Sequence, residues 1–569
     1  MNLRVWAPRA RAVACVVGDQ RWEATPLPDG FWETLSPPPG SDYAFSLDGQ
    51  DPLPDPRSPW QPQGVHGPSR VVDFSAFSWN DEGFRAPPLG SAVLYELHVG
   101  TFSPEGTFDG AAARLDHLVD LGVTHVALMP VASFPGARGW GYDGVALYAP
   151  HGAYGGPAGL QRLVDACHRR GLAVILDVVY NHLGPDGNYL GRFGPYFTDR
   201  YHTPWGEAVN LDGPGSDEVR RFLCDNALMW LGDYHIDGLR LDAIHAIFDC
   251  SATHFLEQLA DEVAALGAAT GRPLVLIAES DRNDPRVVRG REMGGLGLDA
   301  QWSDDFHHAL HSALTGERTG YYEDFGGIAD VAHALTGAYV YDGRYSPHRG
   351  RVHGRPATGV SGHRFLGYLQ THDQIGNRAR GERIGHLIGA RLARAAAALM
   401  LTAPFPPQLF QGEEWGASAP FQYFTAHTAP ELAEAIRQGR QREFAAFGWK
   451  PEDIPDPQDE ATFARSRLDW EEPAREPHAR TLEWYRELIR FRRTTPDLLD
   501  GRMDRVAVAF DEEGWIRVTR GRVTVVANLG PQPVTLSRPL GRLVLATEAP
   551  SEDAELMTMV PESAAIWIR

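Results

Sequence analysis

From about residue 91, short apolar runs alternate along the chain with longer amphipathic segments. Val93–Val99, Val123–Pro130 and Ala173–Val179 are nearly continuous apolar runs, which are typical of strands buried on both faces. In Ala111–Leu121 and Leu160–His168, apolar residues recur with the 3.6-residue period of a helix. This alternation predicts a parallel sheet with helices packed over its faces.

Further strand candidates continue the pattern towards the C-terminus. They are Gly238–Asp242, Leu274–Ala278, Ala300–Asp304, Phe365–Gln370 and Pro407–Gly412. With the first three runs they make eight strands, separated by helical stretches, over about 400 residues. Eight such units predict an α/β fold of the (β/α)8 barrel type with insertions. A doubly wound sheet is the competing architecture.

Both ends of the chain have the short alternating patterns of antiparallel strands. Val13–Val17 and Phe31–Leu35 lie near the start, and Trp515–Thr519 and Arg522–Asn528 near the end. We therefore predict three domains. Residues 1–88 form an N-terminal β-sandwich of carbohydrate-binding type with a proline-rich connector, 89–498 the catalytic barrel, and 499–569 a C-terminal β-sandwich.

Composition narrows the range of partners. The net charge of −21 leaves no basic excess to meet phosphates, so we expect no nucleic-acid or membrane partner. We see no secretory signal and no apolar run near the ~18 residues of a membrane span, so a cytoplasmic location is expected. The cysteines are not spaced as metal ligands, and we expect reduced, packed thiols; they are Cys15, Cys167, Cys224 and Cys250.

Polar residues gather where four of the predicted strands end. The four segments are Asp177–His182, Asp237–His245, Leu276–Asp281 and Thr371–Gln374. Active sites of (β/α)8 barrels lie at the carboxyl ends of the strands. We therefore expect these side chains to meet in one site.

Three acids in these segments have the character that glycoside cleavage needs. Arg240 and Asp242 are two residues apart on one strand and share a face, so the arginine should keep Asp242 ionised, as a nucleophile requires. Glu279 follows an aliphatic run, which should raise its pKa and suit a general acid. Asp373 could stabilise positive charge at the reacting carbon. A single acid at a strand end is more often a helix cap or ion-pair partner, but the joint occurrence favours chemistry on a sugar.

The four segments resemble the four sequence regions of the α-amylase superfamily of glycoside hydrolases. This resemblance implies that Asp242 is the nucleophile, Glu279 the acid/base and Asp373 the third carboxylate, with Arg240 orienting Asp242. It also implies a set of residues that bind the sugar whose bond is cleaved. These are His182 and His372, through hydroxyl groups, and Tyr142, which stacks on the ring.

Other stretches resemble the members of the superfamily that hydrolyse maltooligosyltrehalose. They are Tyr196–Gly206, Gln301–His308, Thr371–Asn377 and Gly439–Phe444. The resemblance implies cleavage of the α-1,4 bond next to the terminal trehalose unit, with trehalose and a maltooligosaccharide as products. Branching enzymes share parts of these stretches, so a branching transglycosylase is the alternative. A catalytically dead α-glucan-binding protein is a further one. No cofactor is expected.

Some residues depart from the usual α-amylase pattern or are weaker candidates. His245 takes the place of a lysine near the nucleophile and is a candidate substrate-binding residue, while Thr371 replaces an asparagine before His372. Asn181 matches a calcium-binding position, but we find no Asp-rich loop to complete such a site, and we expect no metal. Trp205, Tyr321 and Tyr322 are further candidates for the substrate path, with a packing role as the alternative. Glu413 and Glu414 could also reach the site, with a surface role as the alternative.

Overall fold

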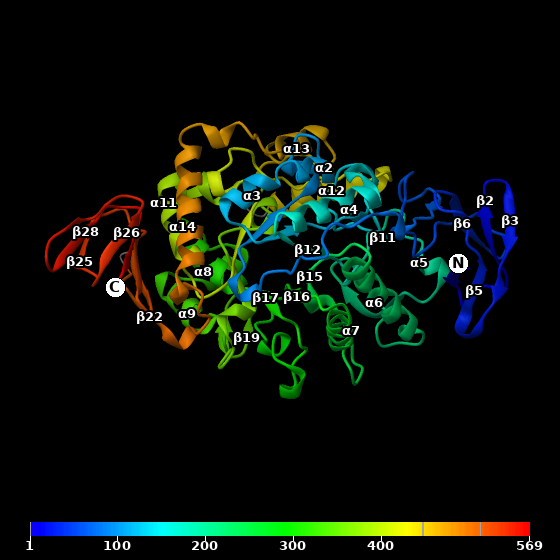
Figure 1. Ribbon diagram of the computed structural model, residues 1–569, viewed down its shortest axis with the longest axis horizontal. Helices are drawn as coiled ribbons and strands as arrows, with labels where there is room; N and C mark the ends of the chain where they lie inside the picture. The colour runs from blue at the N-terminus through cyan, green and yellow to red at the C-terminus, as the bar shows by residue number, and fades with distance from the viewer. Residues whose placement is uncertain (1, 446–448, 513) are drawn as a thin grey trace.

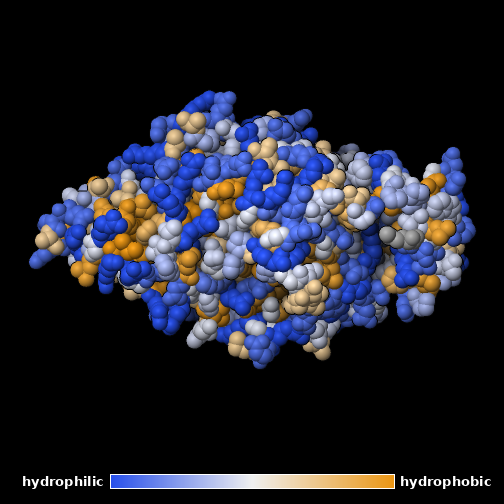
Figure 2. All heavy atoms as spheres, in the orientation of Figure 1, coloured by the Kyte–Doolittle hydropathy of each residue, from blue (hydrophilic) through white to orange (hydrophobic). Residues whose placement is uncertain are grey.

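The protein is elongated, with a barrel at its centre and a β-rich domain at each end (Figure 1). The computed structural model describes residues 2–445, 449–512 and 514–569. On the face shown in Figure 2, polar residues dominate and apolar patches are scattered between them. A polar surface agrees with the net charge of −21.

The central domain is a closed barrel of eight parallel strands, in the order β12-β15-β16-β17-β20-β21-β8-β9. Each lies in one of the eight predicted runs, which confirms the (β/α)8 prediction and excludes the doubly wound sheet. The strands are β8 (Leu94–Leu97), β9 (His125–Leu128), β12 (Ala173–Val178), β15 (Gly238–Leu241), β16 (Val275–Ala278), β17 (Ala300–Trp302), β20 (Phe365–Tyr368) and β21 (Pro407–Phe410).

Helices surround the barrel, and shorter helices lie in the segments that connect its strands (Figure 1). The helix predicted over Ala111–Leu121 is two shorter helices, α2 and α3, of which α2 begins at a Thr107 cap. The helices are α1 (Val99–Phe102), α2 (Phe108–Ala112), α3 (Leu115–Leu121), α4 (Gly156–Arg169), α5 (Leu190–Phe193), α6 (Ser216–Gly232), α7 (Phe255–Thr270), α8 (Asp304–Thr315), α9 (Ile328–Gly337), α10 (His372–Gly376), α11 (Ile384–Leu401), α12 (Pro430–Ala445), α13 (Glu460–Arg465) and α14 (His478–Thr494).

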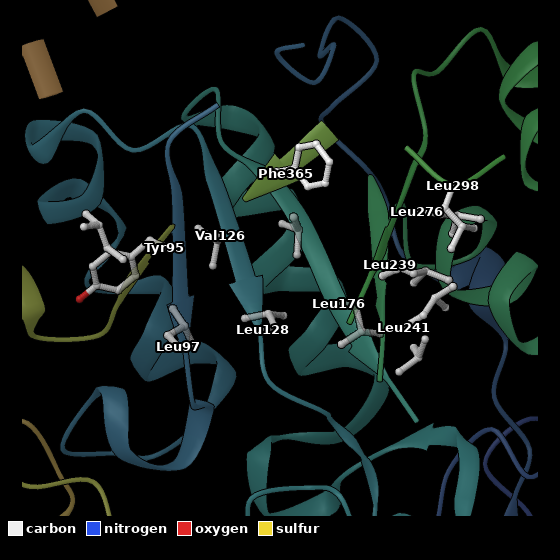
Figure 3. Packing of buried hydrophobic residues seen from close by; sticks show 14 of the residues in the cluster. Tyr95, Leu97, Val126, Leu128, Leu176, Leu239, Leu241, Leu276, Leu298 and Phe365 are labelled. Atoms are coloured by element: carbon white, nitrogen blue, oxygen red, sulfur yellow. The ribbon is translucent and has the colours of Figure 1, made fainter. Parts of the chain in front are cut away.

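Side chains of the barrel strands alternate between two hydrophobic cores. Leu176, Leu239 and Leu276 belong to the large outer core against the helices (Figure 3). Ile175 and Ile277 belong to a smaller cluster inside the barrel. Because side chains alternate with a period of two, the polar residues two positions beyond these inner ones also point into the barrel, at its carboxyl end.

Three two-stranded sheets are inserted in the barrel loops. The sheet of β13 and β14 lies in the long segment between β12 and α6, and the sheet of β18 and β19 precedes β20. Their strands are β10 (Ala132–Ser133), β11 (Ala146–Pro150), β13 (Phe197–Thr203), β14 (Gly206–Val209), β18 (Arg344–Ser346) and β19 (Arg351–His353).

The N-terminal domain consists of two sheets, β1-β5-β4 and β3-β2-β6-β7. It packs against the long segment after β12, because Trp6 meets Tyr196 edge-on at 5.4 Å between ring centroids. Arg57 in the connector donates to Asp225 of α6 at 2.8 Å. The strands are β1 (Asn2–Trp6), β2 (Val13–Val17), β3 (Gln20–Glu23), β4 (Thr25–Pro26), β5 (Phe31–Leu35), β6 (Asp42–Leu47) and β7 (Ser69–Arg70).

The C-terminal domain also has two sheets, β22-β23-β24-β29-β26 and β25-β28-β27. Among the described helices, α11 alone is long and apolar enough to cross a membrane by length and composition. It packs against α8, α14, β24 and β29, so it is a core helix between the barrel and this domain. The strands are β22 (Val506–Phe510), β23 (Trp515–Arg520), β24 (Val523–Asn528), β25 (Val534–Ser537), β26 (Arg542–Ala546), β27 (Ser551–Glu552), β28 (Leu556–Met559) and β29 (Ser563–Ile568).

Two buried arginines donate hydrogen bonds to the carbonyl groups at the C-terminal end of α11. Arg492 donates to the carbonyls of Leu401 and Ala403 at 2.9 Å, and to that of Phe405 at 2.7 Å. Arg520 from β23 donates to the same turn, to Thr402 at 2.7 Å and Ala403 at 2.8 Å. Helix ends leave carbonyls without intrahelical partners, and here side chains from α14 and the C-terminal domain satisfy them.

All four cysteines are free, as predicted. Three are buried. The prediction of a packed thiol is wrong for Cys250, which is exposed in the loop before α7.

Replacing Arg492 with methionine should destabilise the protein by roughly 2–4 kcal/mol, because the buried carbonyls of Leu401 and Phe405 lose their arginine donor, while that of Ala403 keeps Arg520. The shift of the urea unfolding midpoint measures the effect. Arg490 lies on the same helix but is exposed, and its replacement with methionine should cost less than about 0.5 kcal/mol. Equal losses in the two variants would contradict the role given to Arg492.

Candidate active site

One arginine fork joins the two carboxylates predicted to do the chemistry. Arg240, on β15, places Nη1 2.8 Å from Asp242 Oδ1 and Nη2 3.0 Å from Glu279 Oε2. Asp242 follows β15 and Glu279 follows β16, which are neighbouring parallel strands. The structure therefore holds the two acids side by side at the carboxyl end of the barrel.

Arg240 is itself held from two further sides. Its Nη1 donates to both oxygens of Asp177 on β12, at 2.9 and 2.8 Å. The guanidinium lies over the ring of Trp302, with Cζ 4.2 Å from the ring centroid. Planar contacts of this kind favour arginine over lysine, so its orientation is determined before any ligand binds.

The two acids have pKa shifts of opposite sign. Burial alone would raise the pKa of Asp242, but Arg240, His182 and Asn181 together lower it below its usual range. Burial raises the pKa of Glu279 well above its usual range, and Asp242 and Asp373 add to this against the opposing effect of Arg240. These directions favour an ionised Asp242 beside a protonated Glu279. These directions agree with those predicted from the sequence.

The backbone after Asp242 binds Glu279 directly. Ala243 N–H donates to Glu279 Oε2 at 2.6 Å, and Ile244 N–H donates to the Glu279 carbonyl at 3.0 Å. Ala243 is in the left-handed region, with φ 39°, which costs an alanine roughly 1–2 kcal/mol. The hydrogen bonds from Ala243 and Ile244 to Glu279 offset part of this cost and fix Glu279 relative to Asp242.

Asn181 and His182 border Asp242 on the side of β12. Asn181 Nδ2 donates to Asp242 Oδ2 at 2.7 Å, and its Oδ1 lies 2.5 Å from His182 Nδ1. Asn181 thus uses both ends of its amide within the site.

Among the described residues, no group of three or more His, Cys, Asp or Glu side chains is arranged to hold a metal ion. Trp205, 50% exposed, stacks on His182 with ring centroids 4.3 Å apart.

A second series of hydrogen-bonded polar side chains begins at the Tyr142 hydroxyl and continues through His372, on the side of the barrel opposite Asn181 and His182. His372 Nε2 lies 2.7 Å from the Tyr142 hydroxyl, which donates to Asp177 Oδ2 at 2.7 Å. His372 Nδ1 lies 2.7 Å from Glu96 Oε1. Burial opposes the charged imidazole, but Asp373 and Glu96 outweigh it and raise the pKa of His372 to about 9.

Asp373 adjoins this chain at the start of α10. Its Oδ1 lies 3.5 Å from His372 Nε2, and its carboxylate is one-third exposed. Thr371 caps the helix by accepting from Asp373 N–H at 3.2 Å. The threonine that replaces the usual asparagine therefore supports the position of Asp373.

The weaker candidates lie at different places. His245 is partly exposed, 3.8 Å from Asp281 Oδ1, on the side of Glu279. Tyr321 is exposed over His308, whereas Tyr322 is buried and stacks on His311. The proposals for Glu413 and Glu414, a site role or a surface role, are both wrong. Both are buried; Glu414 accepts from the Tyr95 hydroxyl at 3.0 Å, and Glu413 from Tyr485 at 3.1 Å.

Four residues of the site were given no role from the sequence, although Asp177 begins the predicted segment Asp177–His182. Glu96 and Asp177 lie inside apolar strands, where a lone acid is itself a signal, since a buried charge needs a partner. Trp302 lies under Arg240. Asp304 follows β17 and accepts from the Tyr368 hydroxyl; burial raises its pKa to about 7. The last two contacts depend on neighbouring strands and leave no local pattern.

Comparison with known proteins agrees with this geometry. A family model described as the catalytic domain of alpha amylase matches residues 74–196, and the domain of unknown function DUF3459 matches residues 501–567. The malto-oligosyltrehalose trehalohydrolase of Arthrobacter ramosus is 52% identical over 555 residues, 96% of this chain and 96% of its own length. The chain belongs to the malto-oligosyltrehalose trehalohydrolase family. The family member from Rhizobium sp. (strain M-11) is 49% identical over 575 residues, 99% of this chain and 96% of its own length.

A solved structure has the same fold over its whole length. The crystal structure of a Salmonella typhimurium protein described as an alpha amylase superposes with a TM-score of 0.92 at 38% identity. It covers 100% of this chain, and this chain covers 97% of it. This solved structure therefore shares the arrangement of a central barrel between two β-rich domains.

Replacing Glu96 with glutamine should lower the pKa of His372, because the imidazolium loses an anionic partner. The folded-state pKa of about 9 exceeds the ordinary 6.5. The ion pair therefore stabilises the fold fully below pH 6.5, and this contribution is lost as the pH rises through 9. The difference in thermal unfolding midpoint between wild type and E96Q should be larger at pH 6 than at pH 9.5. A difference that does not change with pH would exclude a charged His372.

Proposed function

We propose that the protein hydrolyses the α-1,4-glucosidic bond next to the terminal trehalose unit of maltooligosyltrehalose, releasing trehalose and a maltooligosaccharide. Family membership supports the substrate. The observation that carries the chemistry is the Arg240 fork, which holds an ionised Asp242 beside a protonated Glu279. Such a pair suits a retaining mechanism, in which the carboxyl groups lie only ~5 Å apart.

In the first step, Glu279 donates its proton to the glycosidic oxygen while an oxygen of Asp242 attacks the anomeric carbon. The C–O bond to trehalose breaks, and trehalose leaves with the proton from Glu279. A covalent glycosyl ester on Asp242 remains, and Glu279 is now an anion. Arg240 then balances the negative charge that has moved from Asp242 to Glu279, because it contacts both.

In the second step, water takes the place of trehalose. Glu279 removes a proton from the water as its oxygen attacks the anomeric carbon, and the ester bond to Asp242 breaks. The maltooligosaccharide is released with its original anomeric configuration, and both acids return to their starting protonation states.

The residues around Asp242 would bind the sugar whose bond is cleaved. The Tyr142 ring would stack on the sugar, since pyranose rings present apolar C–H faces. To donate hydrogen bonds to its hydroxyl groups, His182 Nε2 would exchange the Tyr142 carbonyl for the sugar, and His372 Nε2 would exchange the Tyr142 hydroxyl. Asp373 would accept from the hydroxyl groups and stabilise the positive charge of the transition state. On the side of Glu279, His245 would meet the trehalose unit.

Replacing Glu279 with glutamine should lower kcat/KM for trehalose release from maltosyltrehalose by roughly 10²–10⁴-fold, because the amide cannot supply a proton. Glu292, an exposed glutamate after β16, provides the matched control, and E292Q should retain full activity. An E279Q variant as active as E292Q would refute the role of Glu279.

The choice of substrate needs a separate measurement. Maltopentaose and maltosyltrehalose, incubated separately with the protein, should give very different rates, with free trehalose formed rapidly from the second. Preference for maltopentaose would exclude trehalohydrolase specificity. A fall in iodine staining of amylose with new α-1,6 branch points would indicate a branching transglycosylase instead.

A further inference from the structure

Two of the sequence stretches that resemble trehalohydrolases, Thr371–Asn377 and Gly439–Phe444, meet in the structure. The first contains α10, the helix that carries Asp373. The second lies in α12, after β21, and has no part in the steps described above. Arg440 of α12 joins the two stretches, because its Nη2 donates to the carbonyl oxygen of Gly376 at 2.9 Å. A residue outside the barrel strands therefore contacts the helix that holds the third carboxylate.

The helix α10 depends on its neighbours, because it has only five residues. A helix of this length is not stable by itself in water. A capping box holds its N-terminal end, where the N–H and the hydroxyl of Thr371 donate to Gln374 Oε1 at 2.8 and 2.7 Å. The last carbonyls of a helix have no partners within the helix. Gly376 is the last residue of α10, and Arg440 supplies a donor to its carbonyl.

Trp140 packs directly against the backbone at the same end of α10. A Cβ on Gly376 would lie 2.0 Å from the Trp140 ring, so only glycine fits here. Trp140 also meets His372 edge-on, with ring centroids 5.5 Å apart, and its Nε1 donates to the Gln422 carbonyl at 3.0 Å. The C-terminal end of α10 is therefore fixed by an aromatic ring against its backbone and by the guanidinium of Arg440 at its carbonyl.

The guanidinium of Arg440 is oriented by two aromatic rings. Its Cζ lies 4.6 Å from the ring centroid of Phe444, one turn further along α12, and 5.1 Å from that of Tyr423, in the loop after β21. Phe444 is buried, and Tyr423 meets Trp140 edge-on at 5.2 Å between ring centroids. Contacts of this kind fix the plane of a guanidinium. The donor to Gly376 is therefore in place before any substrate binds.

The Asp373 carboxylate needs such support from its helix. Its side chain is one-third exposed, and its contact with His372 Nε2 is 3.5 Å long, which is longer than a good hydrogen bond. The backbone of α10 therefore has a large share in placing the carboxylate. A misplacement of ~1 Å at a group that acts on the reacting centre costs roughly 10²-fold in rate, so small movements of α10 matter.

We infer that Arg440 is a positioning residue for Asp373, and that it acts by holding the C-terminal end of α10. Asp373 is proposed to stabilise the positive charge that develops at the anomeric carbon in the transition state. A displaced Asp373 should therefore slow bond cleavage more than it weakens substrate binding. This inference rests on the proposed function, and it gives the stretch around Arg440 a part in the rate of the reaction.

Replacing Arg440 with methionine removes the donor but keeps an unbranched side chain against Phe444 and Tyr423. R440M should lower kcat for trehalose release from maltosyltrehalose by roughly 10-fold, with KM within about twofold of wild type. R440K keeps a charged donor and should recover part of kcat. Arg437, one turn earlier on α12, pairs with Glu434 at 2.6 Å. R437M is the matched control and should keep full activity.

The pH dependence of the rate separates positioning from a general loss of structure. Asp373 contributes to the raised pKa of Glu279, so a displaced Asp373 should lower that pKa. Because Glu279 acts in its protonated form, the basic limb of kcat/KM should move to lower pH in R440M and stay in place in R437M. The other charged groups that act on Glu279 are unchanged in both variants; they are Arg240, Asp242 and Asp304.

A double-mutant cycle completes the test. If Arg440 acts through Asp373, R440M should cost less than about twofold when it is added to D373N. The inference stands only if the basic limb moves and the two losses fail to add. A fixed limb, a further 10-fold loss in D373N, or full activity of R440M would each overturn it, while the proposed function stands. If the wild-type protein releases no trehalose from maltosyltrehalose, the proposed function itself fails.

Discussion

The site depends on the double contact of one guanidinium. Arg240 reaches Asp242 with one terminal nitrogen and Glu279 with the other, and Asp177 and Trp302 hold it from behind. A buried arginine surrounded by three acids is costly unless each charge is paired. Here the pairing lowers the pKa of Asp242 while burial raises that of Glu279, so the same contacts that stabilise the buried charge also suit the acids to different tasks.

The alternation of strand side chains explains why these residues meet. On β12 and β16, the two strands that flank β15, inward positions are apolar within the barrel, at Ile175 and Ile277, and polar two residues later, at Asp177 and Glu279. A shift of one residue in any strand would move its polar residue into the outer core among the helices. The register that aligns the barrel strands therefore also aligns the polar side chains of the active site.

Much of this arrangement could be predicted from the sequence, because it depends on local patterns. The eight strands are short apolar runs, and the three acids follow such runs directly. Glu413 and Glu414 also follow a strand, yet they pair with Tyr485 and Tyr95 away from the site. Position along the chain could not separate these two cases. The difference lies in which aromatic hydroxyls the fold brings near, and this is set by contacts between distant segments.

The partners of charged groups were harder to predict for the same reason. Glu96 lies on β8 and His372 at the start of α10 after β20, and their ion pair follows from closure of the barrel, which pairs β21 with β8. His427 and Asp143 meet across two loops whose paths no periodicity describes. Regular elements were thus predictable, whereas pairings between loops required the three-dimensional structure.

The packing of Trp6 has a consequence for how separable the domains are. This residue of the first strand lies against Tyr196 and so closely over Gly194 that a Cβ there would come within 2.6 Å of its ring. The segment it covers continues into the hairpin that carries Trp205. The N-terminal domain therefore packs against the segment that leads into this hairpin and supports its position. It is not an independent module, and exchanging it for the sandwich of another protein would reshape the approach to the sugar without altering a residue that touches it.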